Sequence, residues 1–247
     1  MRTMLHAAGG RGSRHSQNQP VALITGAGRG IGRATAEAFA GEGYTVVLAE
    51  ISTTVGRRAA EALICTGVRA VFIRTDVASP ASVKQLVTTV LRRFGRIDCL
   101  VNNAGILSVG PLARLSVRDL DRMVAVNLRG PLLLARAALP AMLRQGSGSI
   151  INVASQLGKY GLGGYVTYCA TKFGVVGFTG ALAAELAGTS VRVWAVCPGL
   201  VDTPMARLSG ATSGAGLIRP QSVARVIVDL ATGLRREASG TAVDVTR

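Results

Sequence analysis

The chain has 247 residues, a formal net charge of +15 and 49% hydrophobic residues. This hydrophobic share is too high for a disordered protein, and no uncharged apolar run reaches the roughly 18 residues that a membrane-spanning helix needs. The only histidines, His6 and His15, lie in the first twenty residues, so the body of the chain cannot assemble a Ser-His-Asp triad or a histidine-ligated zinc site, and we expect no metal.

Arginine supplies most of the positive charge, because Lys84, Lys159 and Lys172 are the only lysines. The cations are scattered, and aromatic residues make up only 4% of the chain, so we expect no specific nucleic-acid partner and no membrane partner. The four cysteines form no C-x-x-C pair. This pattern is typical of free thiols in a reducing compartment and predicts a cytoplasmic location.

Residues 1–19 are rich in Gly, Ser, Gln and Arg and predict a flexible basic arm. From residue 20 to residue 247, strand-like and helix-like patterns alternate without a linker, which predicts one domain. The arm is followed by an apolar run at 21–24, which predicts a buried strand. We expect this strand to lead into a glycine-rich turn and then a helix that begins near Arg33.

The glycine-rich turn places Gly26, Gly30 and Gly32 in the pattern G-x-x-x-G-x-G. A strand, such a turn and a helix together form a cradle for a pyrophosphate, because backbone N–H groups and the helix N-terminus attract its charge. Glycine is required where a Cβ would block the ligand or forbid the turn. The turn therefore predicts a dinucleotide site.

Strands and helices are expected to alternate through the rest of the chain. The expected strands are 44–49, 70–73, 98–101, 149–153, 191–196 and 242–245, and the expected helices include 52–65, one that starts at Ser79-Pro80, and a long stretch at 119–143. This order predicts an α/β fold, a single Rossmann-like doubly wound sheet of about seven parallel strands with helices on both faces.

Tyr168 and Lys172 are four residues apart, which places them on one face of a helix. We expect the ammonium to lower the pKa of the phenol and so to make a proton donor and acceptor for neutral pH. Tyr160 and Tyr165 are rival phenols, but neither has a lysine four residues later. Ser155 follows a strand and has no histidine partner, so it fits a hydrogen-bond donor to a carbonyl oxygen better than a nucleophile.

Seven segments, in order and at characteristic spacing, resemble the short-chain dehydrogenase/reductase family. The resemblance begins at about Pro20, spans nearly the whole remaining chain, and rests on Thr25–Gly32, Asp76-Val77, Asn102–Gly105, Asn127, Ser155, Tyr168 with Lys172, and Pro198-Gly199 followed by Thr203. It implies hydride transfer between a nicotinamide cofactor and a secondary alcohol or ketone.

The resemblance also implies a role for each catalytic residue. Tyr168 would exchange the proton, Ser155 would steady the developing oxyanion, and Lys172 would grip the nicotinamide ribose. Asn127 would lie at a local kink in its helix, whose exposed carbonyl holds a water in a proton relay. An exposed polar residue is the alternative interpretation of Asn127.

A larger set is implied for the cofactor: Gly26, Arg29, Gly30, Ile31, Gly32, Glu50, Asp76, Val77, Asn103, Ala104, Gly105, Tyr168, Lys172, Pro198, Gly199, Val201 and Thr203. Glu50 ends the second strand, where a carboxylate accepts hydrogen bonds from ribose hydroxyls and repels a 2′-phosphate. It favours NAD. Arg29 stands where NADP-using relatives often pair with that phosphate, so NADP is the alternative. Asp76 is equally open to a structural role as a helix N-cap.

The substrate itself is not readable from the sequence. Gln156, Leu157, Tyr160 and Tyr165 are candidates to line its pocket, and residues 205–219 read as a loop-like substrate lid. Family likeness implies a homodimer or homotetramer through the helices that carry Asn127 and Tyr168, although the paired glycines usual after the last strand's aspartate are missing. Two alternatives stay open: an NADPH-dependent 3-oxoacyl thioester reductase, and a non-catalytic basic binding protein on the same fold.

Overall fold

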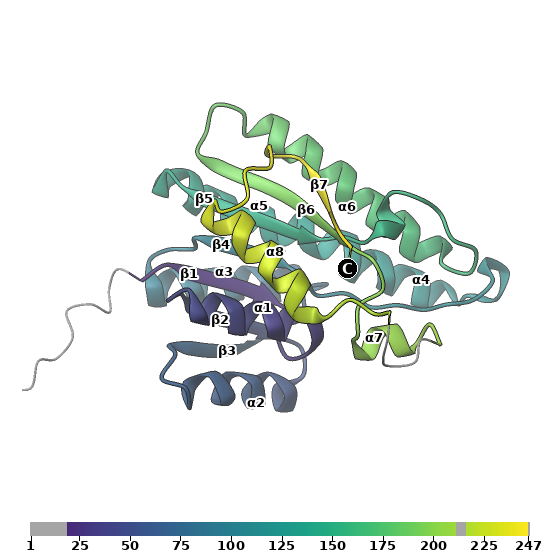
Figure 1. Ribbon diagram of the computed structural model, residues 1–247, viewed down its shortest axis with the longest axis horizontal. Helices are drawn as coiled ribbons and strands as arrows, with labels where there is room; N and C mark the ends of the chain where they lie inside the picture. Colours follow the sequence, from purple (N-terminus) through teal and green to yellow (C-terminus); the bar gives the residue numbers. More distant parts are fainter. Residues whose placement is uncertain (1–18, 211–215, 247) are drawn as a thin grey trace, which may run out of the picture.

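The computed structural model describes residues 19–210 and 216–246. The predicted arm, apart from Gln19, therefore lies outside the described residues, as do both histidines, the middle of the predicted lid and the last residue, Arg247. Figure 1 shows a central sheet with helices packed on both of its faces. Within the described ranges, no helix is both long enough and apolar enough to cross a membrane.

The sheet has seven strands in the order β3-β2-β1-β4-β5-β6-β7, and every pair is parallel. The strands are β1 (Val21–Thr25), β2 (Thr45–Glu50), β3 (Ala70–Arg74), β4 (Cys99–Asn102), β5 (Gly148–Val153), β6 (Val191–Pro198) and β7 (Ala242–Val245). The chain starts in the middle of the sheet, winds outward to β3, and returns to continue at β4. The crevice between β1 and β4, where the winding reverses, is the place where such sheets bind ligands.

Two hydrophobic cores cover the two faces of the sheet, and alternate residues of β1 contribute to each. Ala22 and Ile24 join the core under α1, α2 and α8, whereas Val21 and Leu23 join the core under α3, α5 and α6. This alternation follows from the two-residue period of a strand. Burial on both faces explains why the sequence of β1 is a continuous apolar run.

The helices are α1 (Gly30–Gly41), α2 (Thr53–Ile64), α3 (Pro80–Phe94), α4 (Val117–Val124), α5 (Gly130–Gln145), α6 (Val166–Glu185), α7 (Pro204–Arg207) and α8 (Pro220–Thr232). Two short 3-10 turns, η2 (Leu112–Arg114) and η4 (Gln156–Gly158), precede α4 and α6. The predicted start of α3 is confirmed, because Ser79 is its N-cap and accepts a hydrogen bond from the Ser82 amide at 3.3 Å. Asp76 is therefore not the cap of this helix.

The predicted helical stretch at 119–143 is not one continuous helix. A five-residue π-helical turn, η3 (Ala125–Arg129), separates α4 from α5 and has Asn127 at its centre. Asn127 is 1% exposed, so its interpretation as an exposed polar residue is wrong. Such turns release main-chain groups from the regular helical ladder and are common at functional sites.

The predicted lid is not entirely loop-like. Pro204–Arg207 form the short helix α7, whose N-cap is Thr203 and whose first residue is a proline. A threonine N-cap followed by a proline at the first helical position is a common way for a helix to begin. Beyond it, Val201 and Ile218 form an isolated parallel bridge that closes the base of the segment.

Candidate active site

The glycine-rich turn joins β1 to α1 at the carboxyl edge of the sheet. Gly26 and Gly30 adopt positive φ angles of 62° and 54°, which other residues rarely adopt. A Cβ at Gly32 would lie 2.2 Å from the Gly26 carbonyl oxygen, so only glycine lets α1 approach the turn this closely. Ile31 continues into the first turn of α1 and packs against the core beneath. The turn thus has the geometry of a phosphate cradle.

Glu50 lies directly beside this turn. One of its carboxylate oxygens accepts a 3.3 Å hydrogen bond from the Gly28 amide, and the other accepts bonds from the Ile51 and Ser52 amides at 2.9 and 3.2 Å. These contacts fix the carboxylate at the end of β2. Arg29 is exposed in the same turn. Glu50, which favours NAD, and Arg29, which favours NADP, therefore lie at the same edge of the sheet.

The turn after β4 is fastened to the turn after β1. Thr25 accepts hydrogen bonds through Oγ1 from the amides of Asn103 and Ala104 at 3.0 and 3.1 Å. The Asn103 side chain donates a 2.8 Å bond to the Thr25 carbonyl. Asn102 donates to the Asn152 side chain at 2.8 Å and is buried. Asn102 and Asn103 therefore connect neighbouring segments beside the crevice through their own side chains.

Asp76 and Val77 follow β3 and belong to the same edge. The Asp76 carboxylate accepts a 3.0 Å bond from the Ala78 amide, and the Asp76 amide donates to Ser82 Oγ at 3.0 Å. Val77 is buried, and a Cβ at Gly130 would lie 3.2 Å from it. Local contacts thus account for the conformation of Asp76 and Val77.

The loop after β6 closes over the glycine-rich turn. A Cβ at Gly30 would lie 3.1 Å from the Thr203 methyl group, which brings Thr203 against the cradle. Pro198 ends β6, the Gly199 amide donates to the Val245 carbonyl at 3.3 Å, and Val201 is buried. The cofactor residues predicted in these five distant segments therefore lie at one edge of the sheet.

Ser155 and Tyr168 face each other across the end of β5. Ser155 Oγ accepts a 3.1 Å hydrogen bond from the Leu157 amide, which fixes its rotamer. Burial raises the pKa of Tyr168 to about 12, and a hydrogen bond with the Ser155 side chain counteracts part of that effect. The two hydroxyl groups are close enough to act on one oxygen atom of a substrate.

Lys172 lies one helical turn beyond Tyr168 and is 5% exposed. Its Nζ donates a 2.8 Å hydrogen bond to the Val153 carbonyl and lies 5.5 Å from the centre of the Tyr168 ring. Burial lowers the pKa of Lys172 to about 8. The amine can therefore gain and lose a proton near neutral pH.

The prediction that Lys172 lowers the pKa of Tyr168 is wrong for the protein alone. The pKa of Tyr168 rises because burial disfavours the phenolate, and the hydrogen bond that opposes this effect comes from Ser155. The lysine is buried as well, so its own charged form is disfavoured. The sequence correctly predicted that Tyr168 and Lys172 lie close together. Burial, however, decides the direction in which the pKa of Tyr168 shifts.

Asn127 is held by both of its amide atoms. Its Oδ1 accepts from the Ile106 amide, and its Nδ2 donates to the Ile106 carbonyl, both at 2.8 Å. A Cβ at Gly105 would lie 3.5 Å from Asn127 Oδ1. The side chain thus connects the π-helical turn to the segment after β4.

The predicted substrate residues lie around the Ser155 loop. The Gln156 side chain borders Gly199, where a Cβ would lie 3.1 Å from its Oε1. Leu157 and Tyr165 are half-buried, and Tyr165 immediately precedes α6. Tyr160 is 54% exposed. Gln156 therefore lies between two loops of the site, while Tyr160 is exposed on one of them.

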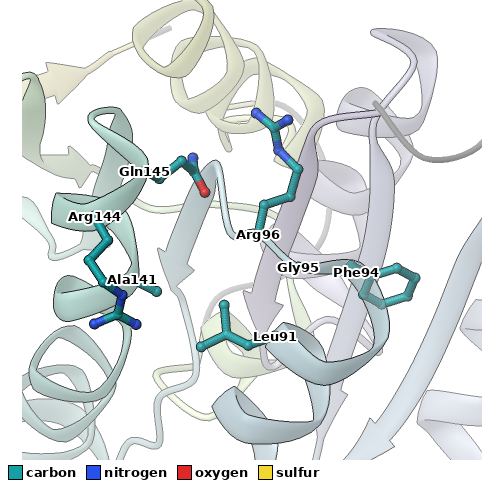
Figure 2. A pocket seen from close by; sticks show the side chains of 7 residues that line it. All are labelled: Leu91, Phe94, Gly95, Arg96, Ala141, Arg144 and Gln145. Atoms are coloured by element: carbon teal, nitrogen blue, oxygen red, sulfur yellow. The ribbon is translucent and has the colours of Figure 1, made fainter.

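A separate cavity lies at the opposite, amino edge of the sheet, between the ends of α3 and α5 (Figure 2). Its volume is ≈ 530 Å³, and none of the predicted site residues lines it; the lining residues are Leu91, Phe94, Gly95, Arg96, Ala141, Arg144 and Gln145. Arg96 is already paired with Asp98 at 2.6 Å. Among the described residues, no three His, Cys, Asp or Glu side chains are grouped so that they could hold a metal ion.

Comparison with known sequences identifies the family. The sequence model of the short chain dehydrogenases matches residues 20–213. The chain is 38% identical to the 3-oxoacyl-[acyl-carrier-protein] reductase FabG of Thermotoga maritima, with 91% of this chain and 95% of that protein covered. It is also 42% identical to the D-threitol dehydrogenase of Mycolicibacterium smegmatis, with 75% and 71% covered.

Solved structures agree with this assignment. Levodione reductase superposes with a TM-score of 0.86 at 32% identity, covering 92% of this chain and 95% of that one. A single-substitution variant of actinorhodin polyketide ketoreductase, solved with NADPH, gives a TM-score of 0.87 at 35% identity and coverages of 93% and 96%. The predicted fold is confirmed. The chain belongs to the short-chain dehydrogenase/reductase family and is an oxidoreductase that transfers a hydride between a nicotinamide cofactor and an alcohol or ketone.

Proposed function

We propose that this enzyme interconverts a secondary alcohol and its ketone through Tyr168, Ser155, Lys172 and Asn127, with NAD as the preferred cofactor. The observation that best supports this proposal is that the side chains of Ser155 and Tyr168 interact beside the buried Lys172. When bound, the nicotinamide supplies the hydride donor or acceptor. The protein supplies the position of the substrate and the path of its proton.

Tyr168 is the proton donor in the direction of ketone reduction. Its raised pKa keeps the phenol protonated at neutral pH, so it can pass a proton to the carbonyl oxygen as negative charge develops there. Ser155 stabilises the same oxygen through a hydrogen bond and needs no base for this role. In the direction of alcohol oxidation, the phenol must first release its proton.

Lys172 and Asn127 give that proton a route to solvent. The pKa of about 8 allows Lys172 to exchange a proton near neutral pH. Because the Asn127 side chain is engaged by Ile106, the relay would use the main-chain carbonyl of the π-helical turn and a water. This arrangement keeps the relay separate from the contacts that hold Asn127 in place.

The proposed preference for NAD depends on Glu50. Its carboxylate is fixed beside Gly28, where it would accept hydrogen bonds from ribose hydroxyls and repel a 2′-phosphate. The remaining cofactor contacts would come from the glycine-rich turn, Asp76-Val77, the turn after β4, and the loop from Pro198 to Thr203. NADPH is the alternative, because Arg29 is exposed in the same turn.

A 3-oxoacyl thioester reductase is the second candidate function. The Thermotoga maritima relative carries that name at 38% identity over 91% of this chain. The non-catalytic alternative has no comparable support, because Ser155, Tyr168 and Lys172 are all present and adjacent. Turnover of thioesters in preference to simple ketones, with NADPH in preference to NADH, would favour the second candidate.

We also propose a homodimer or homotetramer and a cytoplasmic location. Large apolar side chains are exposed on the helices that carry or adjoin the site: Val117, Val124, Leu132, Leu143, Val166 and Phe173. Large apolar side chains that stay exposed on neighbouring helices are typical of a subunit interface. All four cysteines are free thiols, three of them buried, which fits a reducing compartment. Sedimentation analysis of the purified chain would give the number of subunits.

The direct experiment is a panel of secondary alcohols and ketones, followed by nicotinamide absorbance with NAD(H) and NADP(H) in parallel. The proposal expects turnover in both directions with a lower KM for NAD(H). Absence of turnover with every alcohol, ketone and thioester, together with steep salt-dependent DNA binding, would instead support the binding protein.

A further inference from the structure

We infer that the substrate is an uncharged ketone or secondary alcohol with an apolar substituent of several carbons. This inference rests on the proposed function, because it concerns the molecule that would meet Ser155 and Tyr168. It starts from six large apolar side chains that the fold leaves exposed around the candidate site: Val109, Leu112, Tyr160, Leu162, Leu200 and Leu208.

These side chains come from three loops at one edge of the sheet. The loops follow β4, β5 and β6, which are neighbours in the sheet and parallel, so their carboxyl ends lie side by side. The first two loops touch, because the Gly110 amide donates a 2.9 Å hydrogen bond to the Gly164 carbonyl. A Cβ at Gly164 would also lie 3.9 Å from the Val109 side chain.

The third loop reaches the same place from the other side of the site. In the third loop, Gly199 borders Gln156 of the second loop. The third loop also approaches the first, because a Cβ at Gly105 would lie 3.8 Å from the methyl group of Met205 in α7. Leu200 and Leu208 lie just before and just after α7. The three loops therefore contact one another at the edge of the sheet where Ser155 follows β5.

The exposed fractions of these side chains run from 42% for Val109 to 64% for Leu208. Large apolar side chains that stay exposed on neighbouring loops indicate a surface that a ligand or partner covers. A substrate with an apolar arm would cover this surface and gain free energy for each methylene removed from water. A small polyol would leave the leucines in contact with water.

Charged side chains in the three loops are few and do not form an ion-binding cluster. Lys159 is turned away to the last strand, where its Nζ lies 2.8 Å from Asp244 and donates to the Ala242 carbonyl at 2.8 Å. The other charged residues in the described parts of these loops are Arg114 in the first loop and Asp202, Arg207 and Arg219 in the third. The three arginines are divided between two loops, and one of these loops also carries a carboxylate, so we expect a neutral substrate to be used better than a charged one.

The test measures kcat/KM for the series 2-butanone to 2-octanone, with 4-oxopentanoate and a dihydroxylated ketone as charged and polar references. We expect a rise of about two- to fourfold for each added methylene and poor use of both references. A flat series, or a higher kcat/KM for the polar or charged ketone, would overturn the inference. Turnover of 2-butanone that Tyr168→Phe abolishes would leave the proposed function standing even then.

Two variants test whether these leucines cause the rise in kcat/KM along the series, and a third variant is a matched control. Leu112→Asn and Leu208→Asn should each flatten the series, whereas Leu234→Asn should not. Leu234 is 64% exposed, the same as Leu208, but it lies between α8 and β7, at the opposite edge of the sheet. If Leu112→Asn and Leu208→Asn change the number of subunits and leave the series unchanged, a second copy of the chain covers these leucines and the inference is wrong.

Discussion

The Nζ atom of Lys172 donates a 2.8 Å hydrogen bond to the main-chain carbonyl of Val153. Val153 ends β5, and Ser155 follows it by two residues. This contact therefore fastens the helix that carries Tyr168 to the strand that positions Ser155. The buried amine of Lys172 thus helps to fix the hydroxyl groups of Ser155 and Tyr168 relative to each other.

The buried amine predicts an unusual dependence of stability on pH. Between pH 8 and about 10.5, native Lys172 has released its proton while the unfolded lysine still holds it. The unfolded state binds more protons in this window, so the free energy of unfolding rises with pH. Relative to Lys172→Met, the wild type should gain roughly 2–3 kcal/mol between pH 7 and pH 10 in urea titrations.

Lys84→Met is the matched control, because Lys84 is exposed on α3. Its difference from the wild type should not vary over the same range of pH. A constant difference between the wild type and Lys172→Met would show that the amine keeps an ordinary pKa in the native state.

Removal of the Asn127 side chain should lower stability as well as activity. Asn127→Ala would leave the amide and carbonyl of Ile106 without their 2.8 Å partners in a partly buried place. Each such group costs about 1–3 kcal/mol when unsatisfied, so we expect a loss of roughly 2–4 kcal/mol in the free energy of unfolding. Chemical denaturation measures it. A variant as stable as the wild type would contradict the contact with Ile106.

The charge on Glu50 should set the choice of cofactor. In Glu50→Gln we expect NADH to bind about tenfold more weakly and NADPH about tenfold more tightly, because a charge-assisted acceptor is lost and a repulsion is relieved. Fluorescence titration of the reduced cofactors measures both constants. Arg29→Gln serves as the comparison and should weaken NADPH more than NADH. An unchanged ratio in Glu50→Gln would refute the role of the carboxylate.

The strands and the residues of the site were predictable because each has a local signature. Val21–Thr25 is continuously apolar up to its last residue since both faces of β1 are buried, and the four-residue spacing of Tyr168 and Lys172 reflects one face of α6. The boundaries were less accurate. β6 extends to Pro198, two residues beyond its predicted end, because Cys197 and Pro198 pair with Asp244 and Val245 of β7, and such pairing is not visible in either segment alone.

Other features depend on contacts between distant segments. The shift of the Tyr168 pKa follows from burial by the whole fold, so the neighbouring lysine alone gave the wrong sign. The π-helical turn positions Asn127 against Ile106, 21 residues earlier. The family resemblance led us to expect a kink at Asn127, but the hydrophobic periodicity of the segment does not predict one. The short helix α7 was not predicted, although Thr203 as N-cap and Pro204 at the first helical position are common at a helix start.

The most direct measurement compares Tyr168→Phe with the wild type in single-turnover hydride transfer and in cofactor binding. We predict that turnover falls by about 10²–10⁴-fold while the Kd for NADH stays within about twofold, because only the phenolic proton is lost. Tyr44→Phe, which alters a phenol packed on Phe39 against the core, should react like the wild type. Near-normal ketone reduction by Tyr168→Phe would contradict the assignment of the proton donor.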